Sequence, residues 1–119
     1  MATQSAYFAI TDDITEGEFI IRLDDAAKIE HARAVLGGVA GLEPHVMGTI
    51  VKETAPYNPN WSYHFDPATI VFFEIAIEVC DANIGYVEEN LADAGGAFLP
   101  KNHWCPWQSR LVREVEYTA

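Results

Sequence analysis

The sequence predicts an α+β domain in which a mostly antiparallel sheet of five to six strands carries two helices on one face. In the second half of the stretch 61–80, apolar residues alternate with charged or small ones, the period of a strand with one buried face. Residues 26–36 and 81–94 instead carry apolar residues three to four positions apart, as amphipathic helices do. Two helices packed on one face of a sheet would bury both patterns at once.

The first part of the chain is predicted to form a β-hairpin followed by a helix. Residues 6–10 and 18–23 are strand candidates on either side of a polar turn that contains glycine. Asp24 or Asp25 can accept hydrogen bonds from the free N–H groups at the start of the helix over 26–36, and a Gly-Gly pair follows its last apolar residue. These signals predict both ends of the helix.

The rest of the chain is predicted to add four strands and a second helix. Residues 45–53 form one strand candidate. The stretch 61–80 is expected as two strands broken near Pro67, because proline cannot donate to a strand ladder. The spacing of apolar residues then favours a helix over 81–94, and residues 109–117 are expected to close the sheet.

The composition indicates one folded domain with a strongly acidic surface. Half of the 119 residues are hydrophobic, so we expect residues 6–119 to form a single domain and residues 1–5 to be a frayed end. The formal net charge of −11 at pH 7 repels phosphate backbones and anionic membrane surfaces. The sequence therefore argues against nucleic-acid binding and membrane insertion. No secretory leader is recognisable, which leaves both a mature extracellular or periplasmic form and a cytoplasmic protein open.

The two cysteines, Cys80 and Cys105, leave three possibilities open. A disulfide would tie the loop around Cys105 to the central stretch and would stabilise the fold by roughly 3 kcal/mol. Both thiols could instead be unpaired and buried, or could take part in metal binding or catalysis together with His45, His64 or His103. No pair of these residues has the close spacing typical of a zinc site, so we predict no resident metal and no cofactor.

Residues 98–108, called the tryptophan loop below, hold the densest group of candidate binding residues. Exposed tryptophans concentrate binding energy when a partner buries them, although tryptophans that flank a proline can also cap a core. A second aromatic group near the start of the central stretch has the same two interpretations. The candidate binding residues are Lys101, His103, Trp104 and Trp107 in the tryptophan loop and Tyr57, Trp61 and Tyr63 in the second group.

These features favour a non-enzymatic binding domain that presents the tryptophan loop to a protein or carbohydrate partner. A protease inhibitor is one version, because a loop held by a disulfide loses little entropy on binding. The first alternative is a small thiol enzyme with Cys105 as nucleophile and His64 or His103 as base. The second is a calcium-dependent acidic module, although the acidic pairs lack the ligand spacing of an EF-hand loop. The sequence does not determine the oligomeric state.

Six motifs in the chain are distinctive. The most specific are FFExAIEVCDA at 72–82 and WCPW at 104–107. The others are HVxGTIV at 45–51, YNPxWSYH at 57–64, GGAFLP at 95–100 and SxLVREV at 109–115. Together they resemble a family of small, often secreted bacterial and lower-eukaryotic domains, described as uncharacterised or calmodulin-binding-protein-like. The resemblance covers about residues 19–116 and brings no established catalytic residues. It implies an extracytoplasmic setting in which Cys80 and Cys105 are paired.

Overall fold

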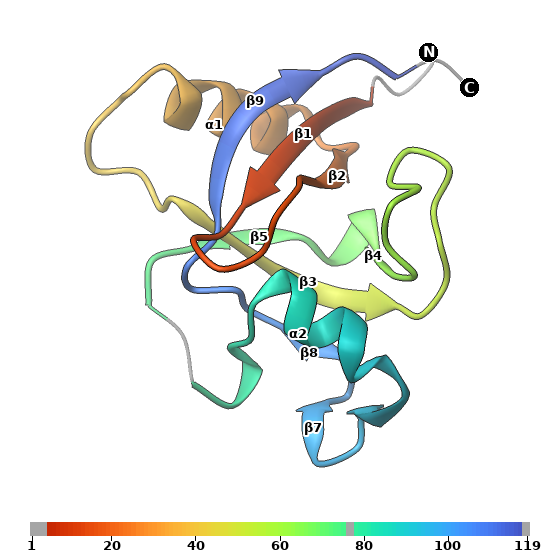
Figure 1. Cartoon of the computed structure of the whole chain (residues 1–119). Helices are drawn as coiled ribbons and strands as arrows, with labels where there is room; N and C mark the ends of the chain where they lie inside the picture. Colours follow the sequence, from red (N-terminus) through yellow and green to blue (C-terminus); the bar gives the residue numbers. More distant parts are fainter. Residues whose placement is uncertain (1–4, 76–77, 118–119) are drawn as a thin grey trace.

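The computed structural model describes residues 5–75 and 78–117, and in this part of the chain it places nine short strands in three small sheets (Figure 1). The strands are β1 (Ala6–Thr11), β2 (Phe19–Leu23), β3 (His45–Val51), β4 (His64–Phe65), β5 (Val71–Phe73), β6 (Ala94–Gly95), β7 (Phe98–Pro100), β8 (His103–Trp104) and β9 (Arg110–Val115). The α-helices are α1 (Ala26–Leu36) and α2 (Ile84–Glu89), and the 3₁₀ helices are η1 (Pro67–Thr69), η2 (Glu78–Cys80) and η3 (Leu91–Asp93). None of the helices in these described ranges is long and apolar enough to cross a bilayer.

The first sheet has the strand order β2–β1–β9, and all of its neighbours are antiparallel. β1 and β2 form the predicted hairpin, with Phe8 opposite Ile21. Helix α1 lies behind this sheet in Figure 1 and buries Ile29 and Ala32. The Asp25 side chain accepts hydrogen bonds from two N–H groups of the first helical turn. The hairpin, the helix and its cap were all correctly predicted.

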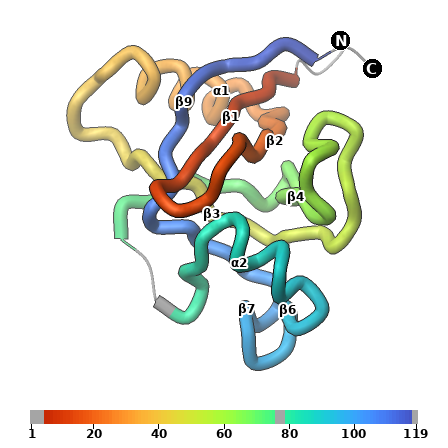
Figure 2. Tube along the Cα trace, in the orientation of Figure 1, coloured from red at the N-terminus to blue at the C-terminus, as the bar shows by residue number. Residues whose placement is uncertain are grey.

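The second sheet is built around β3, which is the longest of the described strands. Its residues 45–47 pair with β5, residues 48–49 with β8 and residues 50–51 with β4, all antiparallel. The chain trace in Figure 2 shows how β3 crosses the middle of the molecule, between the first sheet and α2. The third sheet contains only β6 and β7, which pair in parallel. β3 therefore gathers three segments that lie far apart in the sequence.

Aromatic side chains from the first two sheets meet in one main core. Phe19 of β2 contacts Tyr63, Phe65 and Trp104, with ring centroids 5.0, 6.0 and 5.4 Å away. Trp104 also stacks on Phe65 at 5.0 Å, and all four rings are fully buried. A separate, smaller cluster consists of Phe73, Cys80 and Cys105, with Met47 and Trp107 packed against it.

The predicted single sheet with two helices on one face is wrong. The strands form three small sheets, and only α1 lies along the β2–β1–β9 sheet. Strand length explains the difference, because β4 and β8 have two residues each and no partner runs the length of β3. The predicted helix over 81–94 is also shorter than expected: α2 has six residues, and η3 follows it after Asn90.

The alternation in the central stretch does not continue as one strand. β5 ends at Phe73, and beyond it Ile75 and Val79 are 80% and 68% exposed. Phe73 pairs with the first residue of β3, so the next residue would have to pair with Pro44, which has no N–H group to donate. The predicted strand over this stretch is therefore wrong beyond Phe73. Ile77, which we placed on its buried face, lies outside the described residues.

Candidate functional site

A disulfide joins Cys80 to Cys105, which confirms the first of the three possibilities left open for these cysteines. Their Cα atoms are 5.0 Å apart, and both residues are buried. The Cys105 N–H group donates a hydrogen bond to the Cys80 carbonyl over 2.7 Å. The tryptophan loop is thus held covalently to η2. Disulfides of this kind are typical of oxidising settings, outside the cell or in the periplasm.

Two of the predicted binding residues, Trp104 and Tyr63, lie inside the core. Both are 0% exposed. The Trp104 indole N–H donates to the Ala82 carbonyl at 2.9 Å, and the Tyr63 hydroxyl donates to the Ile84 carbonyl at 2.8 Å. Burial raises the pKa of the Tyr63 hydroxyl well above its ordinary value. In this structure these two side chains hold the molecule together and offer no surface to a partner.

The other five predicted binding residues keep part of their side chains at the surface. Lys101 and His103 lie at the surface of the tryptophan loop, and Trp107, Trp61 and Tyr57 are partly buried. Burial raises the pKa of the Tyr57 hydroxyl to about 12, so this group is protonated at physiological pH. The two predicted groups meet only through their buried members among the described ring contacts, where Tyr63 lies 5.4 Å from Trp104. A binding role for the five surface residues stays a prediction.

A cleft that the sequence did not predict lies around Ile14, in the turn between β1 and β2. It consists of two pockets of about 210 and 320 Å³, and both are lined by Ile14 and Asn83. The smaller pocket is also lined by Asp12, Asp81, Ala82, Pro106, Gln108 and Ser109. The larger is also lined by Thr15, Gly85, Tyr86 and Glu89. We call the two pockets together the Ile14 cleft.

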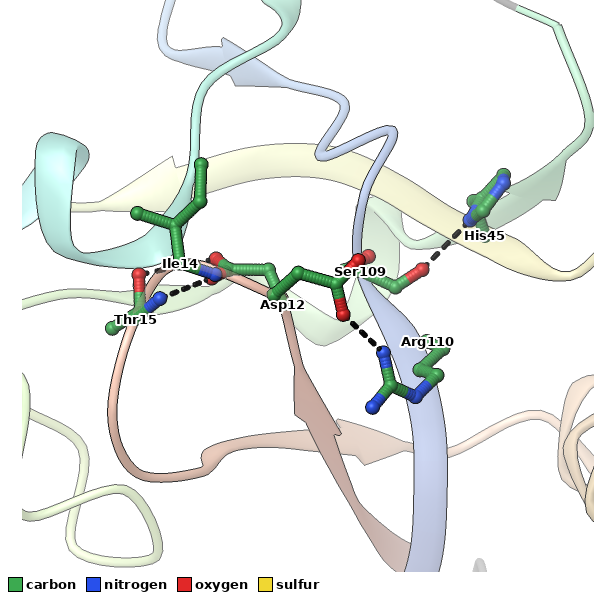
Figure 3. Close-up of polar contacts among 7 residues, drawn as sticks. Asp12, Ile14, Thr15, His45, Ser109 and Arg110 are labelled. Atoms are coloured by element: carbon green, nitrogen blue, oxygen red, sulfur yellow. Dashed lines mark hydrogen bonds and ion pairs between the residues drawn. The ribbon is translucent and has the colours of Figure 1, made fainter.

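Hydrogen bonds to Asp12 fix the turn that carries Ile14 (Figure 3). One carboxylate oxygen accepts from the Ile14 and Thr15 N–H groups at 3.0 and 2.6 Å. The other accepts from the Ile84 N–H at 2.8 Å and the Thr15 hydroxyl at 3.2 Å. The Thr15 hydroxyl in turn accepts from the Gly85 N–H at 2.9 Å. The β1–β2 turn and the start of α2 are therefore joined as one rigid wall.

The electrostatics of Asp12 follow from this arrangement. Burial raises the pKa of the carboxyl, but the N–H groups of Ile84, Thr15 and Ile14 outweigh burial and hold the pKa below its ordinary value. A carboxylate with a lowered folded-state pKa contributes stability above its unfolded-state pKa, which is about 4. That contribution is lost as the pH falls through the folded-state value.

We expect Asp12→Asn to lower the free energy of unfolding at pH 7 by about 1–3 kcal/mol, because the amide presents a donor to backbone N–H groups that then lack an acceptor. Chemical denaturation at several pH values measures this. The wild type should lose stability more steeply than Asp12→Asn as the pH falls from about 5 towards 2. Equal slopes for the two proteins would contradict the role given to Asp12.

The charged side chains among the described residues of the Ile14 cleft are all acidic. Asp12 and Asp81 line the smaller pocket and Glu89 the larger. The Asp81 carboxylate also accepts a hydrogen bond from the Trp107 N–H at 3.1 Å, which joins the tryptophan loop to this wall. Ile14 itself is 67% exposed between the two pockets. The cleft therefore combines an exposed apolar side chain with an acidic surround.

The cleft does not contain a catalytic triad, although a serine, a histidine and an aspartate lie near one another (Figure 3). His45 Nδ1 contacts the backbone carbonyl of Ser109 at 2.8 Å, not its hydroxyl. The Ser109 hydroxyl donates to the Pro106 carbonyl at 2.7 Å. Because the hydroxyl is not hydrogen-bonded to the imidazole, the arrangement lacks an activated nucleophile.

The family to which the chain belongs is known from a comparison of its sequence. Residues 4–118 match the family model described as the BP-74 N-terminal domain. The chain belongs to this family. The match confirms that the chain is a member of a small-domain family, and it does not confirm the calmodulin-binding description. No curated protein and no solved structure matches.

One sequence signal could have pointed to the cleft of this BP-74 N-terminal domain. Ile14 is the only apolar residue between Asp12 and Gly17, in a turn that is otherwise polar and acidic. An apolar side chain in such a turn either packs inward or contributes to an exposed site. The sequence does not show which, because the walls around Ile14 come from residues about 70 and 95 positions further along the chain.

Proposed function

We propose that this chain is a non-enzymatic binding domain whose Ile14 cleft takes a basic, partly apolar segment of a protein partner. The observation that carries the proposal is the exposure of Ile14 between two pockets whose charged lining residues are all acidic. The tryptophan loop takes part as one wall, through Pro106 and Gln108. The disulfide holds that wall in place before a partner arrives, which lowers the entropy cost of binding.

The physical properties of the cleft match those of such a segment. Burying an isoleucine side chain against a partner contributes about 1.5–3 kcal/mol. Lysine or arginine side chains of the partner would lie close to Asp81 and Glu89. The net charge of −11 would speed the approach of a cationic partner, with a rate that falls as salt is added.

The structure gives less support to a carbohydrate partner or a protease. Carbohydrate recognition by ring stacking would depend on Trp107 and Tyr86, since Trp104 is fully buried. Protease inhibitors of the expected kind offer an extended loop to an active site. The exposed tip of the tryptophan loop instead has left-handed backbone at Lys101 and Asn102, with φ of 60° and 61°. We therefore favour a protein partner that binds outside this tip.

The two alternatives from other functional classes also find little support. A thiol enzyme would need Cys105 as a thiolate, whereas its sulfur is held in the disulfide. A calcium module would need several carboxylates around one point. Among the described residues, the only group of three or more potential metal ligands contains Cys80, His103 and Cys105 and no carboxylate. The disulfide also leads us to place the domain outside the cytoplasm.

We expect Ile14→Ser to weaken the binding of a basic apolar peptide by about tenfold or more, since it removes the apolar contact without changing the backbone hydrogen bonds of the turn. Fluorescence polarisation with a labelled peptide of alternating Lys and Leu measures the affinity. Val39→Ser is the matched control, because Val39 is 56% exposed after α1 and lines neither pocket.

A labelled peptide of alternating Glu and Leu separates charge recognition from simple hydrophobic adhesion. It should bind more weakly than the basic peptide, and the difference should shrink in a variant that combines Asp81→Asn with Glu89→Gln. Equal binding of the two peptides, or equal losses in Ile14→Ser and Val39→Ser, would refute the proposed site. Specific binding on a glycan array without peptide binding would move the function to carbohydrate recognition.

A further inference from the structure

We propose that Cys80, Cys105 and His103 form a zinc site when the disulfide is reduced. The possible ligand atoms of the three side chains all lie within 4.8 Å of one another. Two sulfurs and one imidazole nitrogen are a ligand set that Zn²⁺ favours, with one position left for water or another ligand. This corner of the fold would then be held by a covalent bond in an oxidising setting and by a metal in a reducing one.

The backbone brings the three ligands together independently of the disulfide. His103 pairs with Thr49 in the β3–β8 ladder. Alternate residues of an extended chain point to the same side, so His103 and Cys105 share one side while Trp104 points into the core on the other. The hydrogen bond from the Cys105 N–H to the Cys80 carbonyl joins the second cysteine to this pair. These backbone contacts keep the sulfurs adjacent after the covalent bond is broken.

The distances suit zinc after small side-chain movements. Zn–S bonds of about 2.3 Å and Zn–N bonds of about 2.0–2.1 Å in a tetrahedron place two sulfurs about 3.8 Å apart and a sulfur about 3.6 Å from the nitrogen. Separations of up to 4.8 Å between the present ligand atoms are therefore close to the required geometry. Breaking the sulfur–sulfur bond lets the two sulfurs move apart towards the required spacing.

The surroundings give the site a dry side and a wet side. Phe73 packs with the two cysteines, and Met47 and Trp107 cover the same cluster. His103 lies at the surface, which gives a metal ion a route to the sulfurs. An apolar shell with one accessible ligand protects thiolate–zinc bonds from water while allowing the metal to enter.

The chemistry balances with a thiol as reductant. Two reductant thiols give two electrons and two protons to the disulfide, become a disulfide themselves, and leave Cys80 and Cys105 as thiols. Zinc then binds the two thiolates and the neutral imidazole of His103, and the two thiol protons pass to the solvent. The two negative thiolates neutralise the charge of Zn²⁺.

The test is a zinc titration of the full chain, without an affinity tag, in its oxidised and phosphine-reduced forms. A competing chromophoric chelator reports the affinity. We expect the reduced chain to bind one Zn²⁺ and the oxidised chain to bind none. Co²⁺ in place of Zn²⁺ should give a thiolate-to-cobalt charge-transfer band and the visible bands of a tetrahedral site, which distinguishes sulfur ligation from binding at surface carboxylates.

His103→Ala should lower the zinc affinity of the reduced chain by at least about tenfold, because the loss of even an outer-shell partner costs that much. His64→Ala is the matched control, since His64 is a histidine outside the cluster. The proposal is overturned by equal affinities of the oxidised and reduced chains, by a His103→Ala variant that binds as the wild type does, or by a reduced chain that takes up no zinc, whether folded or unfolded.

Discussion

Trp104→Ala should lower the free energy of unfolding by about 3–5 kcal/mol, a large part of the total stability of a domain of this size. The indole is fully buried and contacts the rings of Phe19, Tyr63 and Phe65. Its removal leaves a cavity where the two main sheets meet. It also leaves the Ala82 carbonyl without the indole N–H that donates to it.

Urea denaturation followed by circular dichroism measures this loss, and Trp107→Ala is the matched control. Trp107 lies only partly buried beside the disulfide, so its replacement should cost less than about 2 kcal/mol. Where Trp104→Ala yields no folded protein, Trp104→Phe keeps an aromatic ring and should cost about 1–2 kcal/mol through the lost hydrogen bond. A larger loss in Trp107→Ala than in Trp104→Ala would contradict the burial described here.

The parts of the fold that depend on local pattern were predictable from the sequence. The hairpin of β1 and β2 follows from two short strand patterns around one turn. Helix α1 begins and ends where its predicted cap and its Gly-Gly pair indicate, because a cap satisfies N–H groups only a few residues away. Strand β3 also falls within its predicted range. Each of these elements is specified by neighbours in sequence.

The parts that depend on distant partners were not predictable. The alternation after Phe73 is a good strand pattern, but a strand needs a partner, and the partner chain ends its ladder at Pro44. The order of the sheets depends on which segments pair along β3, and two of its partners, β4 and β8, are only two residues long. A run of two residues carries no period that a sequence pattern could show.

The candidate site illustrates the same limit. Trp104 and Trp107 stand three residues apart in one motif, yet the first is buried in the main core and the second lies beside the disulfide near the surface. Aromatic composition alone cannot separate these two positions, because both capping a core and binding a partner favour tryptophan. The Ile14 cleft needs three segments that meet only in the folded chain, around residues 12–15, 81–89 and 106–109.

Reduction of the Cys80–Cys105 disulfide should lower the free energy of unfolding by about 3.5 kcal/mol, the chain-entropy value for cysteines 25 positions apart. The segment between them has little regular structure of its own, since α2 has six residues and the strands β6, β7 and β8 have two or three. An isolated helix of this length is unstable in water, so the segment depends on its attachments.

Urea denaturation of the oxidised and the phosphine-reduced wild type, both in EDTA so that no metal occupies the reduced pair, isolates the effect of the bond because the side chains are unchanged. The m-value should rise on reduction, since the unfolded chain becomes more expanded without its cross-link. A loss below about 1 kcal/mol would mean that the buried side chains of Ile84, Val87 and Leu99 hold the segment without the bond. The tryptophan-loop wall of the Ile14 cleft would then keep its shape in a reducing setting, and binding through Ile14 would not depend on the redox state of the domain.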